Sequence, residues 1–261
     1  VYIAVPPLFH GTYVEQCVNA RVAIFCEKPL GINVRESRRL VDLVDSSGLP
    51  AGVNFVFSAA PSAVELQHRV ASGEIGQIVR GDLRLHFAEW PRAWHAKAQW
   101  LRLRDQGGWV REVASHFVFI AQRMLGPLFM DTSMFTYLDG PTGTLCETDA
   151  LARMTGSKAP LVMIGTSEGA GPDMNDLTIR GTAGSLRIWD WYRLQHTAGG
   201  EWTDVVGTDR AQLGADAYAA QLDELSLCLE LRGDVPSVST GENELELALL
   251  IGLLVLVFPL F

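Results

Sequence analysis

The chain has 261 residues, of which 48% are hydrophobic and 20% charged, and its formal net charge at pH 7 is -9. Its basic residues are scattered, so the positive surface that nucleic-acid binding requires is missing and nucleic acid is not expected as a partner. This composition, without a repeat or a low-complexity tract, is typical of a folded globular protein with one large or two ordinary domains.

Four cysteines, Cys17, Cys26, Cys146 and Cys228, lie far apart and form no C-x-x-C pair. Neither a disulfide framework nor a zinc site is therefore expected, no metal is predicted, and the predicted location is cytoplasmic. No basic region precedes an apolar segment at the N-terminus, so no signal peptide is expected. The chain starts without methionine on "VYIAVPP", which reads as a strand already under way, so we expect it to be the remainder of a longer protein.

The first 57 residues alternate between apolar runs and amphipathic segments. The pattern predicts strands at 1–6, 21–27 and 50–57 and helices at 10–20 and 34–47. Such a βαβαβ order requires a parallel sheet with right-handed crossovers, which is part of a doubly wound α/β fold. Ligands of these sheets gather beyond the carboxyl ends of the strands, so this edge is the first place to look for a site.

The pattern changes near residue 58, which indicates a second domain over 58–261. Alternating segments predict strands at 77–88, 130–138, 146–155, 160–168, 174–181 and 184–191, and amphipathic segments predict helices at 62–73, 107–125 and 213–232. We expect an α+β domain with an open, mainly antiparallel sheet and a helix at its C-terminal end. The whole chain is thus predicted to combine a partial doubly wound parallel domain with this second domain.

The C-terminal segment from Leu247 to Phe261 has 15 residues without a single charged or hydrogen-bonding side chain. It is shorter than the roughly 20 residues that a membrane-spanning helix needs, so membrane association is not expected. Two interpretations stay open: a helix buried in the fold or in an interface, and an altered or membrane-touching terminus.

The run "AIFCEKPLGI", residues 23–32, places Glu27, Lys28 and Pro29 where a predicted buried strand ends. A lysine at this rim can donate up to three hydrogen bonds and can stabilise negative charge that develops on an oxygen. Pro29 fixes the exit from the strand. The alternative is a surface Glu-Lys pair that caps a strand.

Glu112 and His116 are four residues apart in a predicted helix, so their side chains point to one face. A histidine beside a carboxylate is suited to proton transfer near neutral pH. The alternative is an ordinary acid–histidine pair on a helix surface.

The segment before this helix is crowded with tryptophans and arginines: Trp90, Arg92, Trp94, Trp100, Arg102, Arg104 and Trp109. Interleaved aromatic and basic residues are one way to stack nucleic-acid bases. In an acidic protein and in a loop, a lid over a substrate or cofactor is the interpretation that we favour.

Several stretches, taken in order, resemble the Gfo/Idh/MocA oxidoreductases, the family of glucose-fructose oxidoreductase and inositol dehydrogenase. They are "VYIAVPPLFHGTYVEQCVNARVAIFCEKPLGINVRESRRLVD", "GVNFVFSAAPSAVELQHRVASGEIGQI", "QGGWVREVASHFVF" and "LTIRGTAGSLRI". The resemblance implies an NAD(P)-binding Rossmann domain, and a second domain whose open sheet serves contacts in a homo-oligomer. No G-x-G-x-x-G follows a strand anywhere in the chain, so the first βαβ unit with its pyrophosphate site is expected to be absent.

The resemblance also implies roles for single residues. The lysine matching Lys28 contacts the nicotinamide ribose and the reacting oxygen of the substrate, and the glutamate matching Glu27 sets the loop. The histidine matching His116 transfers the proton. The family usually has aspartate at position 112, so Glu112 puts the identity of the substrate in doubt more than the type of reaction.

The remaining implied positions lie near the cofactor: Pro6, His10, Pro29, Asn54 and Trp100. His10 could equally be the polar start of a helix. Two positions depart from the family pattern. Val56 stands where arginine or lysine is common, and Trp100 with Arg102 only approximates the usual Trp-Arg pair.

The predicted function is hydride transfer between NAD or NADP and a hydroxyl-bearing carbon of a sugar, cyclitol or related diol. Two alternatives stay open: an elimination or hydrolysis assisted by tightly held NAD, and a catalytically silent sugar-binding or regulatory module. The absent glycine loop favours the silent module, whereas the retention of both Lys28 and His116 opposes it.

Overall fold

The computed structural model describes residues 1–233, and these form two compact units. The first unit contains residues 1–55 and the part of the last helix from Leu222 onward, and the second contains Val56–Gln221. The apolar segment 247–261 lies outside the described residues, so both interpretations of it stay predictions.

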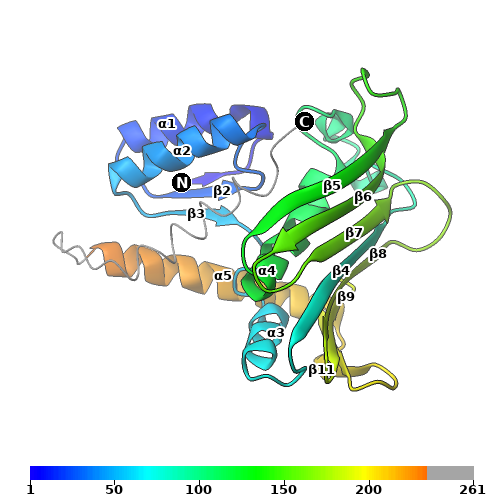
Figure 1. Ribbon diagram of the computed structural model, residues 1–261. Coiled ribbons are helices and arrows are strands. Elements are labelled where there is room, and N and C mark those ends of the chain that lie inside the picture. The colour runs from blue at the N-terminus through cyan, green and yellow to red at the C-terminus, as the bar shows by residue number, and fades with distance from the viewer. Residues whose placement is uncertain (234–261) are drawn as a thin grey trace. The chain divides into compact units, whose positions relative to one another are not determined.

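The first unit is built on a parallel sheet in the order β1-β2-β3. Its strands are β1 (Tyr2–Ile3), β2 (Ile24–Glu27) and β3 (Ala51–Asn54), and its helices are η1 (Pro7–Phe9), α1 (His10–Asn19) and α2 (Val34–Ser47). Helices α1 and α2 cover one face of the sheet (Figure 1). The predicted βαβαβ order is confirmed.

Local signals explain where these elements begin and end. Helix α2 begins after Asn33, whose side chain accepts a hydrogen bond of 2.9 Å from the Glu36 backbone N–H. It ends at Gly48, which has a φ of 65°. Its apolar stripe faces the sheet, and the core of the unit consists of Ile3, Val14, Cys17, Ile24, Cys26, Leu40 and Val44.

The second unit is built on an eight-stranded sheet in the order β11-β10-β9-β8-β4-β7-β6-β5. The strands are β4 (Ile78–His86), β5 (Leu128–Tyr137), β6 (Glu147–Gly156), β7 (Leu161–Thr166), β8 (Met174–Gly181), β9 (Ser185–Trp189), β10 (Arg193–Thr197) and β11 (Thr203–Val206). Only the β4–β7 pair is parallel, so the expected open and mainly antiparallel sheet is confirmed. Strands β10 and β11 were not expected from the sequence, because both are short and β10 is largely polar.

Helices α3 (Pro61–Ala71) and α4 (Ser115–Leu125) pack against one face of this sheet (Figure 1). Alternate residues of the strands point toward these helices, as the period of two in a strand requires. The resulting core contains Leu66, Leu83, Leu85, Phe117, Ile120, Leu177, Ile179, Leu186 and Ile188. The short helices η2 (Ala93–His95) and η3 (Gln99–Arg102), the π-helical turn η4 (Val110–Ala114) and α5 (Arg210–Gly233) complete the described chain.

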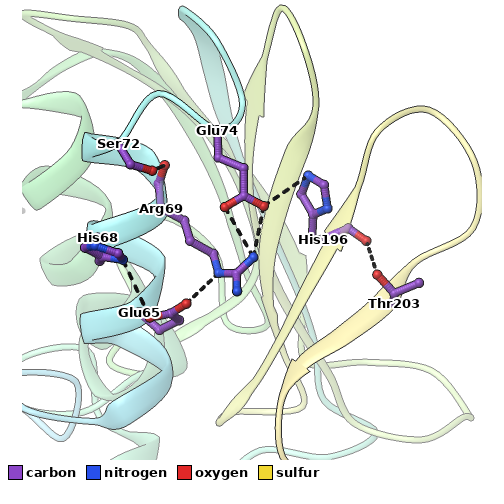
Figure 2. Close-up of polar contacts among 7 residues, drawn as sticks. All are labelled: Glu65, His68, Arg69, Ser72, Glu74, His196 and Thr203. Atoms are coloured by element: carbon purple, nitrogen blue, oxygen red, sulfur yellow. Dashed lines mark hydrogen bonds and ion pairs between the residues drawn. The ribbon is translucent and has the colours of Figure 1, made fainter.

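A charged cluster fastens α3 and the turn after it to strand β10. Figure 2 shows the Glu74 carboxylate between the Arg69 guanidinium and the His196 ring. Arg69 Nη1 lies 2.9 Å from Glu74 Oε1, and His196 Nε2 lies 3.6 Å from the same oxygen. On the helix itself, Arg69 Nε donates to Glu65 Oε1 at 2.6 Å. These contacts hold the edge strands close to the body of the unit.

Within residues 1–233, no helix is long and apolar enough to cross a bilayer. The same part of the chain contains no group of three or more side chains placed to hold a metal ion.

Candidate active site

The ends of β2 and β3 and the side chain of Tyr2 from β1 meet at the carboxylate of Glu27. Glu27 is the last residue of β2 and is paired with Asn54, the last residue of β3. Its Oε1 accepts hydrogen bonds from the Tyr2 hydroxyl and from Asn54 Nδ2, the latter at 2.7 Å. The carboxylate is therefore fixed at the rim of the sheet, immediately before Lys28. Tyr2 was not identified from the sequence as part of this rim.

Asn54 is nearly buried, at 6% exposed, and its side chain is only partly satisfied. Its Oδ1 has no hydrogen-bond partner among the described residues, although its Nδ2 is bonded to Glu27. A buried carbonyl oxygen without a donor costs free energy, so this atom is suited to a ligand that carries an N–H group.

His10 connects the turn after β1 to the turn after β2. It is the first residue of α1 and is fully buried; its Nε2 lies 2.8 Å from the Val5 carbonyl oxygen and its Nδ1 lies 3.0 Å from that of Pro29. A neutral imidazole donates through only one nitrogen, so the tautomer decides which of these contacts is a hydrogen bond. The histidine thus contacts the Pro29 carbonyl, directly after the cis Lys28–Pro29 peptide, and its predicted place near a cofactor stays a prediction. Pro6, half-buried, precedes η1 directly.

Two glycines bring the chain into the helix that carries Glu112 and His116. A Cβ atom at Gly107 would lie 2.5 Å from the backbone of Leu101, so only glycine allows this approach. Gly108 has a φ of 95°, and a Cβ there would lie 2.6 Å from Oε2 of Glu147. Glu147 is nearly buried and its Oε1 accepts a hydrogen bond of 2.7 Å from the Val110 backbone N–H. Glu147 therefore fixes the start of the helical segment.

Glu112 and His116 lie on two different kinds of helix. The sequence predicted one helix over 107–125, but Glu112 belongs to the π-helical turn η4 and His116 to α4. Glu112 is 9% exposed and His116 is 7% exposed, so neither is an ordinary surface residue. The π-helical turn is a rare element that is frequent at functional sites.

The buried charges around this turn are partly desolvated. Burial lowers the pKa of the Arg111 guanidinium, and the charges of Glu147 and Glu112 oppose this effect. Burial also raises the pKa of the Glu147 carboxyl, against the hydrogen bond from Val110. Loss of water strengthens electrostatic interactions inside such a site.

His116 is surrounded by aromatic rings of the second unit. Its ring centroid lies 6.3 Å from that of Phe57 and 6.1 Å from that of Trp191, both with edge-to-face geometry. Trp191 also lies 5.5 Å from Phe117. The sequence analysis missed Trp191, because it stands in a hairpin turn about 75 residues away and no motif marks it.

The tryptophans before this helix do not act as one group. Trp109 is fully buried and packs 5.9 Å from Phe87, which makes it a core residue. Trp90 is half-buried and its Nε1 donates to the Leu101 carbonyl at 3.0 Å. Trp100 is half-buried in η3, and Trp94 is 74% exposed. Of these four, Trp94 is the exposed one, and the predicted lid over a substrate or cofactor stays a prediction.

Comparisons with known proteins agree with these features. Residues 1–55 match the family model described as "Oxidoreductase family, NAD-binding Rossmann fold" (GFO_IDH_MocA). An uncharacterised oxidoreductase of Rhizobium meliloti is 36% identical over 78 residues, which cover 30% of this chain and 23% of that protein. An uncharacterised oxidoreductase of Schizosaccharomyces pombe is 24% identical over 245 residues, which cover 85% of this chain and 62% of that protein.

The fold likeness extends further than the sequence match. An inositol dehydrogenase homologue of Azotobacter vinelandii, solved with NADH and myo-inositol, superposes with a TM-score of 0.72 at 17% identity, over 90% of this chain and 67% of that one. The motifs and the match over residues 1–55 make the chain similar to the Gfo/Idh/MocA oxidoreductases, and the common fold extends this similarity to the second unit.

Proposed function

We propose that the chain takes part in hydride transfer between NAD or NADP and a hydroxyl-bearing carbon of a sugar, cyclitol or related diol. The observation that carries the proposal is the Glu27-Lys28-Pro29 rim, which lies inside the segment that matches the NAD-binding family model. The related Azotobacter protein, which binds NADH and myo-inositol, supports the same class of cofactor and substrate.

The residues of the rim fit a dinucleotide. Asn54 Oδ1 is a buried acceptor that lacks a donor within the described part of the chain, and a nicotinamide carboxamide carries N–H donors. Lys28 follows the fixed Glu27 carboxylate and supplies a cation at the carboxyl ends of the parallel strands, where such folds bind nucleotides. When bound, the cofactor would supply the acceptor or donor of the hydride.

The chain's own groups would handle the proton and the charge. In the oxidative direction His116 accepts the hydroxyl proton, and Lys28 stabilises the negative charge that develops on the oxygen. Glu112 orients His116 or holds a neighbouring hydroxyl. Because Glu112 and His116 are nearly buried, their interactions are less weakened by water than those of surface groups.

Two substitutions test this assignment. We expect Lys28→Ala and His116→Asn each to lower turnover by at least about 100-fold, since electrostatic and proton-transfer groups contribute that much. The measurement is the change in nicotinamide absorbance with a panel of polyols, in the protein as its gene encodes it. Lys158→Ala and His68→Asn change exposed residues of the same types and serve as controls.

Three outcomes distinguish the alternatives. Turnover that is unchanged in both variants would remove Lys28 and His116 from the reaction. Binding of a sugar without any binding of NAD or NADP would favour the silent module. Release of a non-oxidised product without net change of the nicotinamide would favour the NAD-assisted elimination or hydrolysis.

A further inference from the structure

Arg92 is a cation enclosed by aromatic rings, and its charge is only partly compensated. Its Cζ lies 4.7 Å from the ring centroid of Phe87, 5.8 Å from those of Trp90 and Trp94, and 5.9 Å from that of Trp191. Its side chain is 14% exposed. It forms an ion pair with Asp173, whose Oδ2 lies 3.1 Å from Arg92 Nε.

One nitrogen of the Arg92 guanidinium is buried without a hydrogen bond. Its Nη2 has no partner within residues 1–233, whereas its Nε faces the Asp173 carboxylate. The Asp173 carboxylate is 43% exposed and also accepts a hydrogen bond of 3.3 Å from the Ala88 backbone N–H. Burial lowers the pKa of the Arg92 guanidinium, which reflects the same loss of water. A buried cation in this state would be stabilised by a further anion.

Trp191 contacts the same guanidinium and also the ring of His116. It lies in the turn between β9 and β10, where Asp190 and Trp191 have φ values of 46° and 69°. Glycine or asparagine is the usual choice at positive φ, and a bulky residue there costs on the order of 1–3 kcal/mol. The nearly buried Asn175 fixes the turn by accepting the Trp191 backbone N–H at 2.5 Å. Strain held in this way is frequent at ligand sites.

We propose that Trp191 and Arg92 form an acid-recognition site beside His116, in which the Trp191 ring packs against the C–H face of a sugar and Arg92 pairs with a carboxylate on the same molecule. The inference deepens the proposed function, because it assigns the substrate to the sugar acids. A carboxylate matches the planar fork of a guanidinium, and an aromatic slot suits a flat group with a single charge. The same fork also matches a phosphate, so the test below includes a sugar phosphate.

The Trp94 ring is the exposed one of the four rings around Arg92. It lies 5.8 Å from the Arg92 Cζ and is 74% exposed. In the proposed site the carboxylate would approach past this ring. Phe87 is fully buried, and Trp191 packs against Phe117.

Titration calorimetry tests the proposal without any need for turnover. The ligands are two matched pairs, D-galacturonate with D-galactose and D-glucuronate with D-glucose, each pair differing only in a carboxylate at C6. We expect at least one acid to bind the wild-type chain at least about tenfold more tightly than its neutral partner, as a charge-assisted hydrogen bond provides. Equal binding within both pairs, or no binding of either acid, would overturn the proposal.

Variants then assign the preference to Arg92. We expect Arg92→Gln to abolish the preference for the acid, and Arg92→Lys to retain only part of it because lysine lacks the fork. Arg187→Gln is the matched control, since Arg187 also lies over two tryptophans, pairs with one aspartate and is 19% exposed. A preference that survives in Arg92→Gln, or that is lost equally in Arg187→Gln, would overturn the assignment. If Arg92→Gln does not fold, the proposal is decided by the acid preference of the wild-type chain and by its partial loss in Arg92→Lys.

Two further arms separate this inference from other outcomes. Tighter binding of D-glucose 6-phosphate than of D-glucuronate would overturn the sugar-acid class in favour of a phosphate. Binding of the acid together with a complete lack of hydride transfer would support the acid site and count against the proposed oxidoreductase activity. Hydride transfer to neutral sugars without any preference for the acids would count against the acid site and support the proposed oxidoreductase activity.

Discussion

Gly108→Ala adds one methyl group directly before the helical segment that carries Glu112 and His116, and it should destabilise the protein. Its φ of 95° is unfavourable for alanine, which costs about 1–2 kcal/mol. The new Cβ would also lie 2.6 Å and 2.7 Å from the two carboxylate oxygens of Glu147. Moving Glu147 away breaks its hydrogen bond to the Val110 N–H, and a bond to a charged group is worth about 1.5–3 kcal/mol. We expect Gly108→Ala to lower the free energy of unfolding by roughly 3–5 kcal/mol.

Urea denaturation followed by circular dichroism measures this loss, and Gly73→Ala is the control. Gly73 has a φ of 81° with no atom within 4 Å of the added Cβ, so it isolates the backbone cost. A double-mutant cycle with Glu147→Ala tests the cause, because removal of the carboxylate should reduce the cost of Gly108→Ala to that of Gly73→Ala. Equal losses for Gly108→Ala and Gly73→Ala in the wild-type background would refute the reasoning.

Two further predictions concern the first unit and the thiols. His10→Ala removes a buried ring and its hydrogen bond to the Val5 or the Pro29 carbonyl, so we expect the free energy of unfolding to fall by about 2–4 kcal/mol; denaturation that matches wild type would contradict this. Burial raises the pKa of both Cys26 and Cys146 from 9.0 to about 12, so at pH 8 almost no thiolate exists at either position. Mass spectrometry after iodoacetamide treatment of the native protein should find both unlabelled, and rapid labelling would refute their burial.

The elements that depend on local sequence were predictable. The strands and helices of residues 1–57 follow from apolar runs, from the Asn33 cap and from Gly48, all of which act within a few residues. Strand β10 depends instead on a partner, because its residues from Arg193 to Thr197 are mostly polar and pair with β9 in full register. A short polar strand carries no periodic signal of its own, so only the neighbouring strand explains it.

The same distinction holds for the candidate site. The Glu27-Lys28-Pro29 rim could be predicted because its residues are adjacent in the chain. The bonds that fix Glu27 come from Tyr2 and Asn54, which are 25 and 27 positions away, so the sequence shows no connection between them. The π-helical turn at Glu112 lies beside contacts of Gly108 and Val110 with Glu147, whereas helical periodicity alone predicts a regular helix.

Arg92 and Arg187 have similar surroundings but differ in how fully protein groups satisfy them. Both lie over tryptophan rings and both have one aspartate partner, so their sequence contexts and their burial are alike. Arg187 is completed by protein groups, since its Nε donates to Gln195 at 2.8 Å and its Nη1 to Asp176 at 3.4 Å. Arg92 has its Nε beside Asp173, but its buried Nη2 makes no hydrogen bond in the described chain, and its neighbour Trp191 has a positive φ. Unsatisfied groups and strained backbone are frequent at ligand sites. Arg92, whose Nη2 lacks a partner in the described chain, is therefore the arginine to test with an acid.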